Sequence, residues 1–197
     1  QTCALPILVR GASFRTPAER VDLMPASPEL AGLESALAGR TSRERQLEKA
    51  LRRLDAGRRW DVVLMDCPPD LYVGTVNALT ACNELYVPTT AEYLPLRGLR
   101  QLEDKCAEVA EDLNPGLRIS GIIVTRYNPR RNLDAAVCAA LERRYGGALF
   151  ATRIRENVRL AESPRHRTDI ATYAPSSNGA RDYAALAREV ARRFEGS

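Results

Sequence analysis

The chain has 197 residues, a formal net charge of +4 at pH 7, 45% hydrophobic residues and 27% charged residues. These values are ordinary for one globular domain and exclude collagen, low-complexity disorder and coiled coils. The longest apolar runs are well short of the roughly 18 residues that a membrane span needs, and we expect neither a span nor a secretory leader.

The cysteine and histidine content excludes several kinds of site. Five cysteines show no C-x-x-C spacing, so we expect reduced cytosolic thiols rather than a disulfide framework or a zinc site. The single histidine, His166, excludes most His-based metal sites and catalytic triads.

The basic residues are unevenly distributed along the chain. Residues 126–167 contain ten arginines and four acidic residues, a local charge of +6. Such a segment indicates an anionic partner, for example nucleic acid or a nucleotide; the alternative is a set of solvated helix faces.

Apolar periodicity alternates between strand and helix along the chain. Helical spacing appears near residues 47–54, 99–113, 133–141 and 183–194, and residues 11–20 are expected to form a loop. Continuous apolar strands separated by helices favour an α/β fold with a parallel sheet covered on both faces. The expected strands are Val21–Met24, Val62–Met65, Leu85–Val87, Ile119–Thr125 and Leu149–Ile154.

The sharpest local feature is the segment from Trp60 to Pro69. An apolar run ends in Asp66, and Pro68 and Pro69 stop it soon afterwards. We therefore predict Asp66 at the carboxyl end of a central strand, where doubly wound sheets bind ligands and where a carboxylate can hold hydrated Mg²⁺. The alternative is that Asp66 only caps the following turn or helix.

Several motifs, in order along the chain, resemble the ParA-type partition ATPases of the deviant Walker A superfamily. The Asp-Cys-Pro-Pro sequence at 66–69, followed by residues 75–81, resembles the Walker B and switch region of that family. The resemblance covers about residues 20–195, whereas residues 125–129 look more like the MinD branch. Further matches are Val87-Pro88, Leu113-Asn-Pro115, Gly121–Thr125, Asn157–Pro164 and Tyr173-Ala-Pro175.

The resemblance implies a mostly parallel, doubly wound, P-loop NTPase-like sheet that lacks its first strand and P-loop. It also implies that Asp66 is the catalytic Walker B carboxylate and holds Mg²⁺ through water. Pro68 and Pro69 would belong to the switch that responds to the γ-phosphate. Segments that surround the nucleotide base in relatives contain Arg126, Asn157 and Pro175.

The resemblance further implies a DNA-binding role for two arginines. Arg130 and Arg159 fall where family members place arginines for non-specific DNA binding, in agreement with the local charge of +6. The sequence departs from the family pattern in two places. Arg155-Glu156 replaces the usual Pro-Arg, and Ala174 replaces the usual Asp.

The Gly-rich Walker A loop with its two lysines has no counterpart in the chain. Neither Lys49 nor Lys105 follows a glycine, and no G-x-x-x-x-G-K occurs. Residues 1–7 resemble a translated sequencing-library adapter. We therefore expect a read artefact fused to a truncated gene fragment from environmental DNA, with residues 8–197 forming one partial ATPase domain. The alternative is a real short N-terminus on a degenerate paralogue.

For the full-length parent, the resemblance implies ATP-driven dimerisation, non-specific DNA binding and hydrolysis stimulated by a centromere-binding partner of ParB type. Such a protein acts in chromosome or plasmid partition, is cytoplasmic and nucleoid-associated, and does not use a membrane. ATP and Mg²⁺ would be cofactors of the parent. No cofactor is expected in the fragment, which is expected to be inactive because it lacks the Walker A loop. The alternatives are a MinD-like membrane-associated positioning ATPase and a nucleotide-free binding module of the same fold.

Overall fold

The computed structural model describes residues 14–15, 21–26, 28–55, 60–91 and 95–195. The chain divides into two compact units. Unit 1 contains residues 1–83 and 104–118, and unit 2 contains residues 84–103 and 119–197. The expected artefact at residues 1–7 lies outside the described residues, as does most of the expected loop at 11–20.

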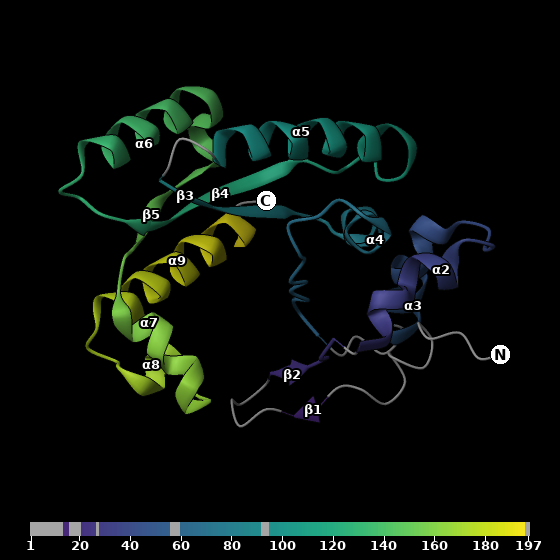
Figure 1. Ribbon diagram of the computed structural model, residues 1–197, viewed down its shortest axis with the longest axis horizontal. Helices are drawn as coiled ribbons and strands as arrows, with labels where there is room; N and C mark the ends of the chain where they lie inside the picture. Colours follow the sequence, from purple (N-terminus) through teal and green to yellow (C-terminus); the bar gives the residue numbers. More distant parts are fainter. Residues whose placement is uncertain (1–13, 16–20, 27, 56–59, 92–94, 196–197) are drawn as a thin grey trace. The chain divides into compact units, whose positions relative to one another are not determined.

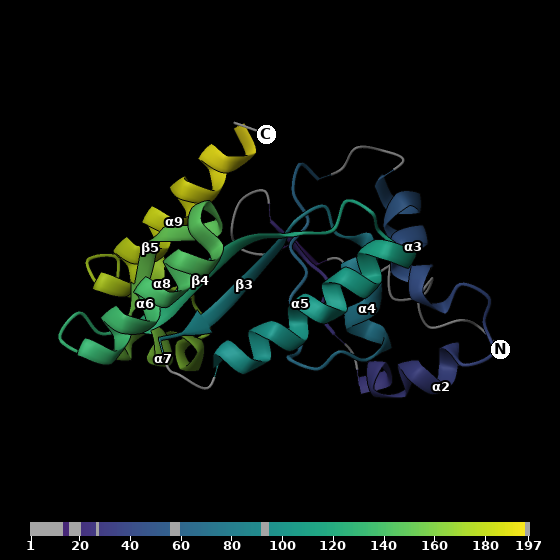
Figure 2. The same ribbon diagram turned by 90° about the horizontal axis from the view of Figure 1, so that it is seen from above.

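Unit 2 is built on a parallel sheet of three strands in the order β3-β4-β5 (Figures 1 and 2). The strands are β3 (Leu85–Thr90), β4 (Ile119–Tyr127) and β5 (Leu149–Arg155). Each coincides with an apolar run in the sequence, so the predicted parallel α/β fold is confirmed for this unit. Parallel strands need a crossover between them, and α5 and α6 provide these crossovers.

Helices cover both faces of this sheet. On one face, Leu99 of α5 (Pro95–Asp112) and Leu141 of α6 (Asn132–Tyr145) pack in a core with Ile122 and Val124. On the other face, α9 (Asn178–Glu195) packs against β5, and Figure 1 shows the two layers of helices on either side of the strands. The short element η3 (Gly146–Ala148) lies between α6 and β5, and α7 (Val158–Glu162), η4 (Ser163–His166) and α8 (Ile170–Tyr173) follow β5.

Carboxylates from α9 satisfy the backbone of β5, the outer strand. The register between β4 and β5 shifts after Ile122, so consecutive residues of β5 are not all paired with β4. Glu189 accepts hydrogen bonds from the backbone N–H of Ala151 at 2.7 Å and of Thr152 at 2.9 Å. These contacts join α9 to the strand and give two of its backbone donors a partner.

Unit 1 is a group of helices held together by a buried asparagine, Asn77. Its side-chain oxygen accepts from the N–H of Leu47 at 3.0 Å, and its amide donates to the carbonyls of Arg43 at 2.9 Å and Val73 at 2.8 Å. These bonds join α4 to the two elements that precede it. The helical elements of the unit are η1 (Pro28–Gly32), α2 (Leu33–Leu37), η2 (Arg43–Arg45), α3 (Gln46–Asp55), α4 (Val73–Ala81) and the second half of α5.

Two predicted strands of unit 1 are not found as predicted. Residues 61–66 form no strand in the structure, and Val62, Val63 and Leu64 are exposed. The run at 21–24 supplies only β2 (Asp22–Leu23), which pairs antiparallel with β1 (Phe14–Arg15) instead of joining a parallel sheet. Apolar runs predict burial, but a strand also needs a neighbour for its ladder, and residues 61–66 have none among the described residues.

Within the described part of the chain, no helix is long and apolar enough to cross a membrane.

Candidate functional site

The candidate site of unit 2 begins at the carboxyl ends of β4 and β5. Arg126, the penultimate residue of β4, has a φ of 51°. This left-handed conformation is unusual for a residue with a side chain and is found disproportionately at functional positions. The N–H of Glu156 donates to the carbonyl of Tyr127 at 3.1 Å, which joins the ends of the two strands.

A short, hydrogen-bonded turn connects β4 to α6 and carries Arg130. The carboxylate of Asp134, which is buried, accepts from the N–H of Asn128 at 2.7 Å. The side chain of Asn128 in turn accepts from the N–H of Arg130 at 3.0 Å. Because the backbone of the turn is satisfied in this way, Arg130 and Arg131 project from a fixed base while remaining exposed.

Asn157 and Arg159 lie directly after β5, at the start of α7. The Asn157 side chain caps this helix by accepting from the N–H of Arg159 at 2.8 Å. The Arg159 guanidinium pairs with Glu162 at 2.9 Å, and the Tyr173 hydroxyl donates to the same carboxylate at 3.1 Å. Hydrogen bonding to Tyr173, followed by that to Glu162, raises the pKa of Arg159, so its charge is permanent.

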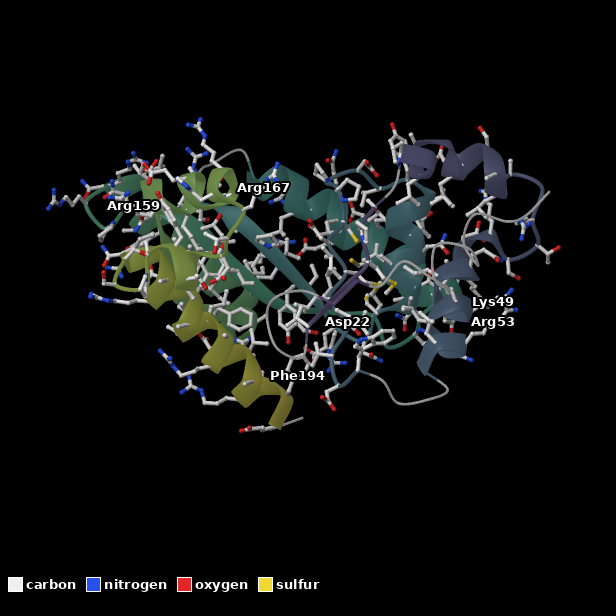
Figure 3. The ribbon with its side chains drawn as sticks, turned by 90° about the horizontal axis from the view of Figure 1, so that it is seen from below. Asp22, Lys49, Arg53, Arg159, Arg167 and Phe194 are labelled. Atoms are coloured by element: carbon white, nitrogen blue, oxygen red, sulfur yellow. The ribbon has the colours of Figure 1, made fainter. Side chains whose placement is uncertain are left out.

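Figure 3 shows the side chains of Arg159 and Arg167, which both come from the segment between β5 and α8, whereas Phe194 lies near the end of α9.

Two charged residues of this edge were not predicted as site residues. Glu156 lies between Arg131, whose guanidinium is 3.4 Å from its carboxylate, and Arg126, at 3.9 Å. All three side chains are about half exposed or more. The only sequence signal for this cluster is the replacement of the family's Pro-Arg by Arg155-Glu156.

Arg155 has a structural role. It binds Asp182 of α9 through its N–H at 3.0 Å and through its guanidinium at 2.9 and 2.6 Å. Its charge therefore contributes little to an anion-binding surface. The local charge of +6 counted for residues 126–167 thus overstates the positive charge that is free to bind an anion.

Pro175, the third residue predicted near the nucleotide base, lies after α8. It lines a shallow surface depression of about 280 Å³ together with residues of α8 and α9. The structure therefore places Arg126 and Asn157 next to each other through Glu156, and gives Pro175 different neighbours.

Asp66, Pro68 and Pro69 lie in unit 1 and are exposed. The prediction that Asp66 ends a central strand is wrong for this structure, since residues 61–66 form no strand. Partial desolvation of the exposed Cys67 thiol, and then the charges of Asp66 and Asp70, raise the pKa of Cys67.

The described residues do not complete a site for Mg²⁺ and ATP. Among them, no three His, Cys, Asp or Glu side chains gather as a metal site would require. No Gly-rich loop with a lysine occurs in the sequence to hold the phosphates. Asp66 alone could hold Mg²⁺ only through water, so no chemical step is derived from these residues.

The parallel sheet with helices on both faces, and with charged side chains gathered at the carboxyl ends of its strands, defines an α/β protein of the P-loop NTPase type. Solved structures agree with this class. Cobyrinic acid a,c-diamide synthase from Mycobacterium smegmatis, solved with a bound ATP analogue and magnesium, superimposes with a TM-score of 0.79 at 32% identity. The match covers 98% of this chain and 73% of that structure.

Sequence comparisons identify the family. Residues 7–119 match the model of an AAA domain. Sporulation initiation inhibitor protein Soj of Bacillus subtilis is 37% identical over 97% of this chain and 77% of its own length. Chromosome-partitioning ATPase Soj of Thermus thermophilus is 43% identical over 91% of this chain and 69% of its own length. The chain belongs to the ParA/Soj family of partition ATPases, as its motifs predicted.

Proposed function

We propose that this chain is the DNA-facing part of an ATPase that positions chromosomes or plasmids. In the parent protein, Mg-ATP would drive dimerisation, the dimer would bind DNA without sequence preference, and a centromere-binding partner of ParB type would stimulate hydrolysis. The name of the Thermus thermophilus relative supports the partition role, and the ATP analogue and magnesium named for the mycobacterial structure support the cofactors. The protein would act at the nucleoid in the cytoplasm.

The observation that carries the proposal is the gathering of arginines at the carboxyl edge of the sheet in unit 2. Arg130 projects from the fixed turn after β4, and Arg159 from the capped start of α7 after β5. Both arginines are exposed, and no described hydrogen bond or ion pair holds the Arg130 guanidinium. Guanidinium groups presented in this way bind phosphates of any sequence.

The family motifs assign nucleotide roles to several residues. We propose that Asp66 holds Mg²⁺ through water and that Pro68 and Pro69 form the switch before α4. The segments that contain Arg126, Asn157 and Pro175 would surround the base. In the chain as given, these groups lack a phosphate-binding loop, and we propose that it does not hydrolyse ATP by itself.

Salt-dependent DNA binding tests the DNA role. We expect weak binding of this chain to a duplex of arbitrary sequence, with an affinity that falls steeply with salt because Arg–phosphate contacts release counterions. Arg130→Ala should weaken binding and reduce the log–log salt slope by about one, and Arg159→Ala should do so by less, because Glu162 pairs with Arg159 at 2.9 Å. Fluorescence anisotropy over a salt series measures both quantities.

The matched control for this test is Arg143→Ala. Arg143 is an exposed arginine in the last turn of α6, within the same basic segment, and its substitution changes the net charge by the same amount. The assignment of Arg130 and Arg159 to the DNA-binding surface is refuted if all three variants change the slope equally, or if neither Arg130→Ala nor Arg159→Ala changes it.

A further inference from the structure

The carboxyl edge of the sheet in unit 2, where the arginines gather, also contains a carboxylate that pairs with two of them. The carboxylate of Glu156 lies 3.4 Å from the Arg131 guanidinium and 3.9 Å from that of Arg126. The two oxygens of this carboxylate are divided between the two arginines, Oε1 toward Arg126 and Oε2 toward Arg131. A phosphate group presents its oxygens in a similar way.

The position of Glu156 follows from its backbone rather than from the ion pairs. Its N–H is bound to the carbonyl of Tyr127 at 3.1 Å, and it stands between Arg155, which Asp182 anchors, and Asn157, which caps α7. The carboxylate is thus held close to the ends of both strands. Arg131 belongs to the turn that Asp134 fixes through Asn128. Hydrogen bonds therefore fix the backbone on both sides of the ion pair, at Glu156 and at Arg131.

We infer that Arg126 and Arg131 form a phosphodiester-binding site that Glu156 occupies in the free protein and leaves when DNA binds. This inference rests on the proposed DNA role and adds two things to it. Arg131 becomes a further phosphate contact, and Glu156 becomes a group that weakens DNA binding.

The ion pairs of Glu156 are weak enough for a DNA phosphate to replace its carboxylate. The exposed fractions of the side chains are 66% for Arg126, 57% for Arg131 and 47% for Glu156, so water already competes for all three charges. Ion pairs of this exposure contribute little to stability. A DNA phosphate can therefore replace the carboxylate without disrupting the fold, whereas Arg155, bound by three hydrogen bonds to the buried Asp182, stays in place.

The pair Arg159–Glu162 offers a useful contrast. Its carboxylate is fixed by a second donor, the Tyr173 hydroxyl at 3.1 Å, in addition to the guanidinium at 2.9 Å. Among the described contacts, the carboxylate of Glu156 is bound by arginines alone. Glu156 is therefore the carboxylate at this edge that a phosphate displaces most easily.

The test is a double-mutant cycle of DNA binding with the whole chain. We expect Glu156→Gln to tighten binding to an arbitrary-sequence duplex about two- to fivefold and to steepen the log–log salt slope by about one to two. Arg131→Ala alone should have a small effect, since its charge is offset by Glu156. In the Glu156→Gln background, Arg131→Ala should cost most of the affinity that was gained, and the two effects should not be additive.

The control is Glu142→Gln, which changes the net charge equally. Glu142 is exposed on α6, about 15 Å along the helix from the turn that carries Arg131. An equal gain for Glu142→Gln and Glu156→Gln, or additive effects in the cycle, would overturn the inference.

The same experiment separates this inference from the proposed function. If Arg130→Ala and Arg159→Ala weaken binding and Glu156→Gln does not strengthen it, the inference is wrong and the DNA role stands. If Glu156→Gln strengthens binding while Arg130→Ala and Arg159→Ala have no effect, the phosphate site is Arg126 and Arg131 and the assignment of the other two arginines is wrong. If no variant binds duplex DNA, both are overturned.

Discussion

Asp182 fixes the end of β5 by accepting three hydrogen bonds from a single residue, Arg155. Burial disfavours the charged carboxylate and by itself would raise the pKa of Asp182. The hydrogen bonds from the side chain and backbone of Arg155 outweigh burial, and the pKa is lowered. The charged form of Asp182 therefore stabilises the fold.

We expect Asp182→Asn to lower the free energy of unfolding by about 1–2 kcal/mol at neutral pH. The hydrogen bonds from Arg155 would lose their charged acceptor, and one carboxylate oxygen would be replaced by an amide nitrogen that cannot accept. A group with a lowered folded pKa stabilises above its unfolded pKa, which is about 3.9 for Asp. This stability is lost as the pH falls through the folded value. The difference between wild type and variant should thus be constant above about pH 5 and shrink below about pH 4.

Urea denaturation at several pH values measures this difference. Glu142→Gln is the control, since Glu142 is exposed on α6, and it should leave the unfolding free energy nearly unchanged. A difference between wild type and Asp182→Asn that grows toward acid pH would contradict the assignment.

At the scale of elements, β4 is the central strand of its sheet and carries a glycine where two aromatic rings meet. A Cβ on Gly121 would overlap the ring of Phe150 and lie 2.6 Å from a ring atom of Tyr86. These rings are packed in the core under α9, with their centroids 5.6 Å apart. The glycine is therefore needed for packing between the strands and this helix layer.

We expect Gly121→Ala to destabilise the protein by about 1–3 kcal/mol, as overpacking of a core does. Gly98, in α5, provides the opposite case, because a Cβ there would meet no atom within 4 Å. Gly98→Ala should raise stability by about 0.5–1 kcal/mol through the better helix propensity of alanine. Thermal and urea unfolding of both variants check these signs, and destabilisation by Gly98→Ala as large as that by Gly121→Ala would refute the packing argument.

The elements show what could be predicted from the sequence. The apolar runs at 85–87, 119–125 and 149–154 became β3, β4 and β5 because each has a parallel neighbour. The run at 62–65 is equally apolar and forms no strand. Periodicity reports which residues prefer burial, whereas strand pairing depends on segments distant in sequence, which no local pattern reveals.

The candidate site was predictable to a similar extent. The positions of Arg130, Arg159 and Asn157 after strands followed from matched motifs, and the structure places them at the ends of β4 and β5. The pairing of Glu156 with Arg126 and Arg131 could not be predicted, because these residues are 25 to 30 positions apart and meet only through the adjacent strand ends.

For the whole molecule, the decisive property is the binding of Mg-ATP. We expect isothermal titration of this chain with Mg-ATP to give a dissociation constant above about 100 μM. The sequence contains no Gly-rich loop followed by lysine, and such a loop supplies several charge-assisted hydrogen bonds worth about 1.5–3 kcal/mol each.

Asp66→Ala is the companion variant for this titration. It should behave like wild type, because one exposed carboxylate holds hydrated Mg²⁺ poorly without phosphates to share the ion. A dissociation constant below about 100 μM, lost in Asp66→Ala, would show that the chain completes a nucleotide site in another way.

The carboxylates of α9 along β5 have a consequence for how the sheet of unit 2 can be extended. An outer strand normally offers its free N–H groups as a template for another chain. On β5, Glu189 already accepts from Ala151 and Thr152, and Asp182 accepts from Arg155. A peptide that binds by adding itself as a strand would have to displace both carboxylates there. At this edge of the sheet, strand addition by another chain would therefore compete with the carboxylates of α9.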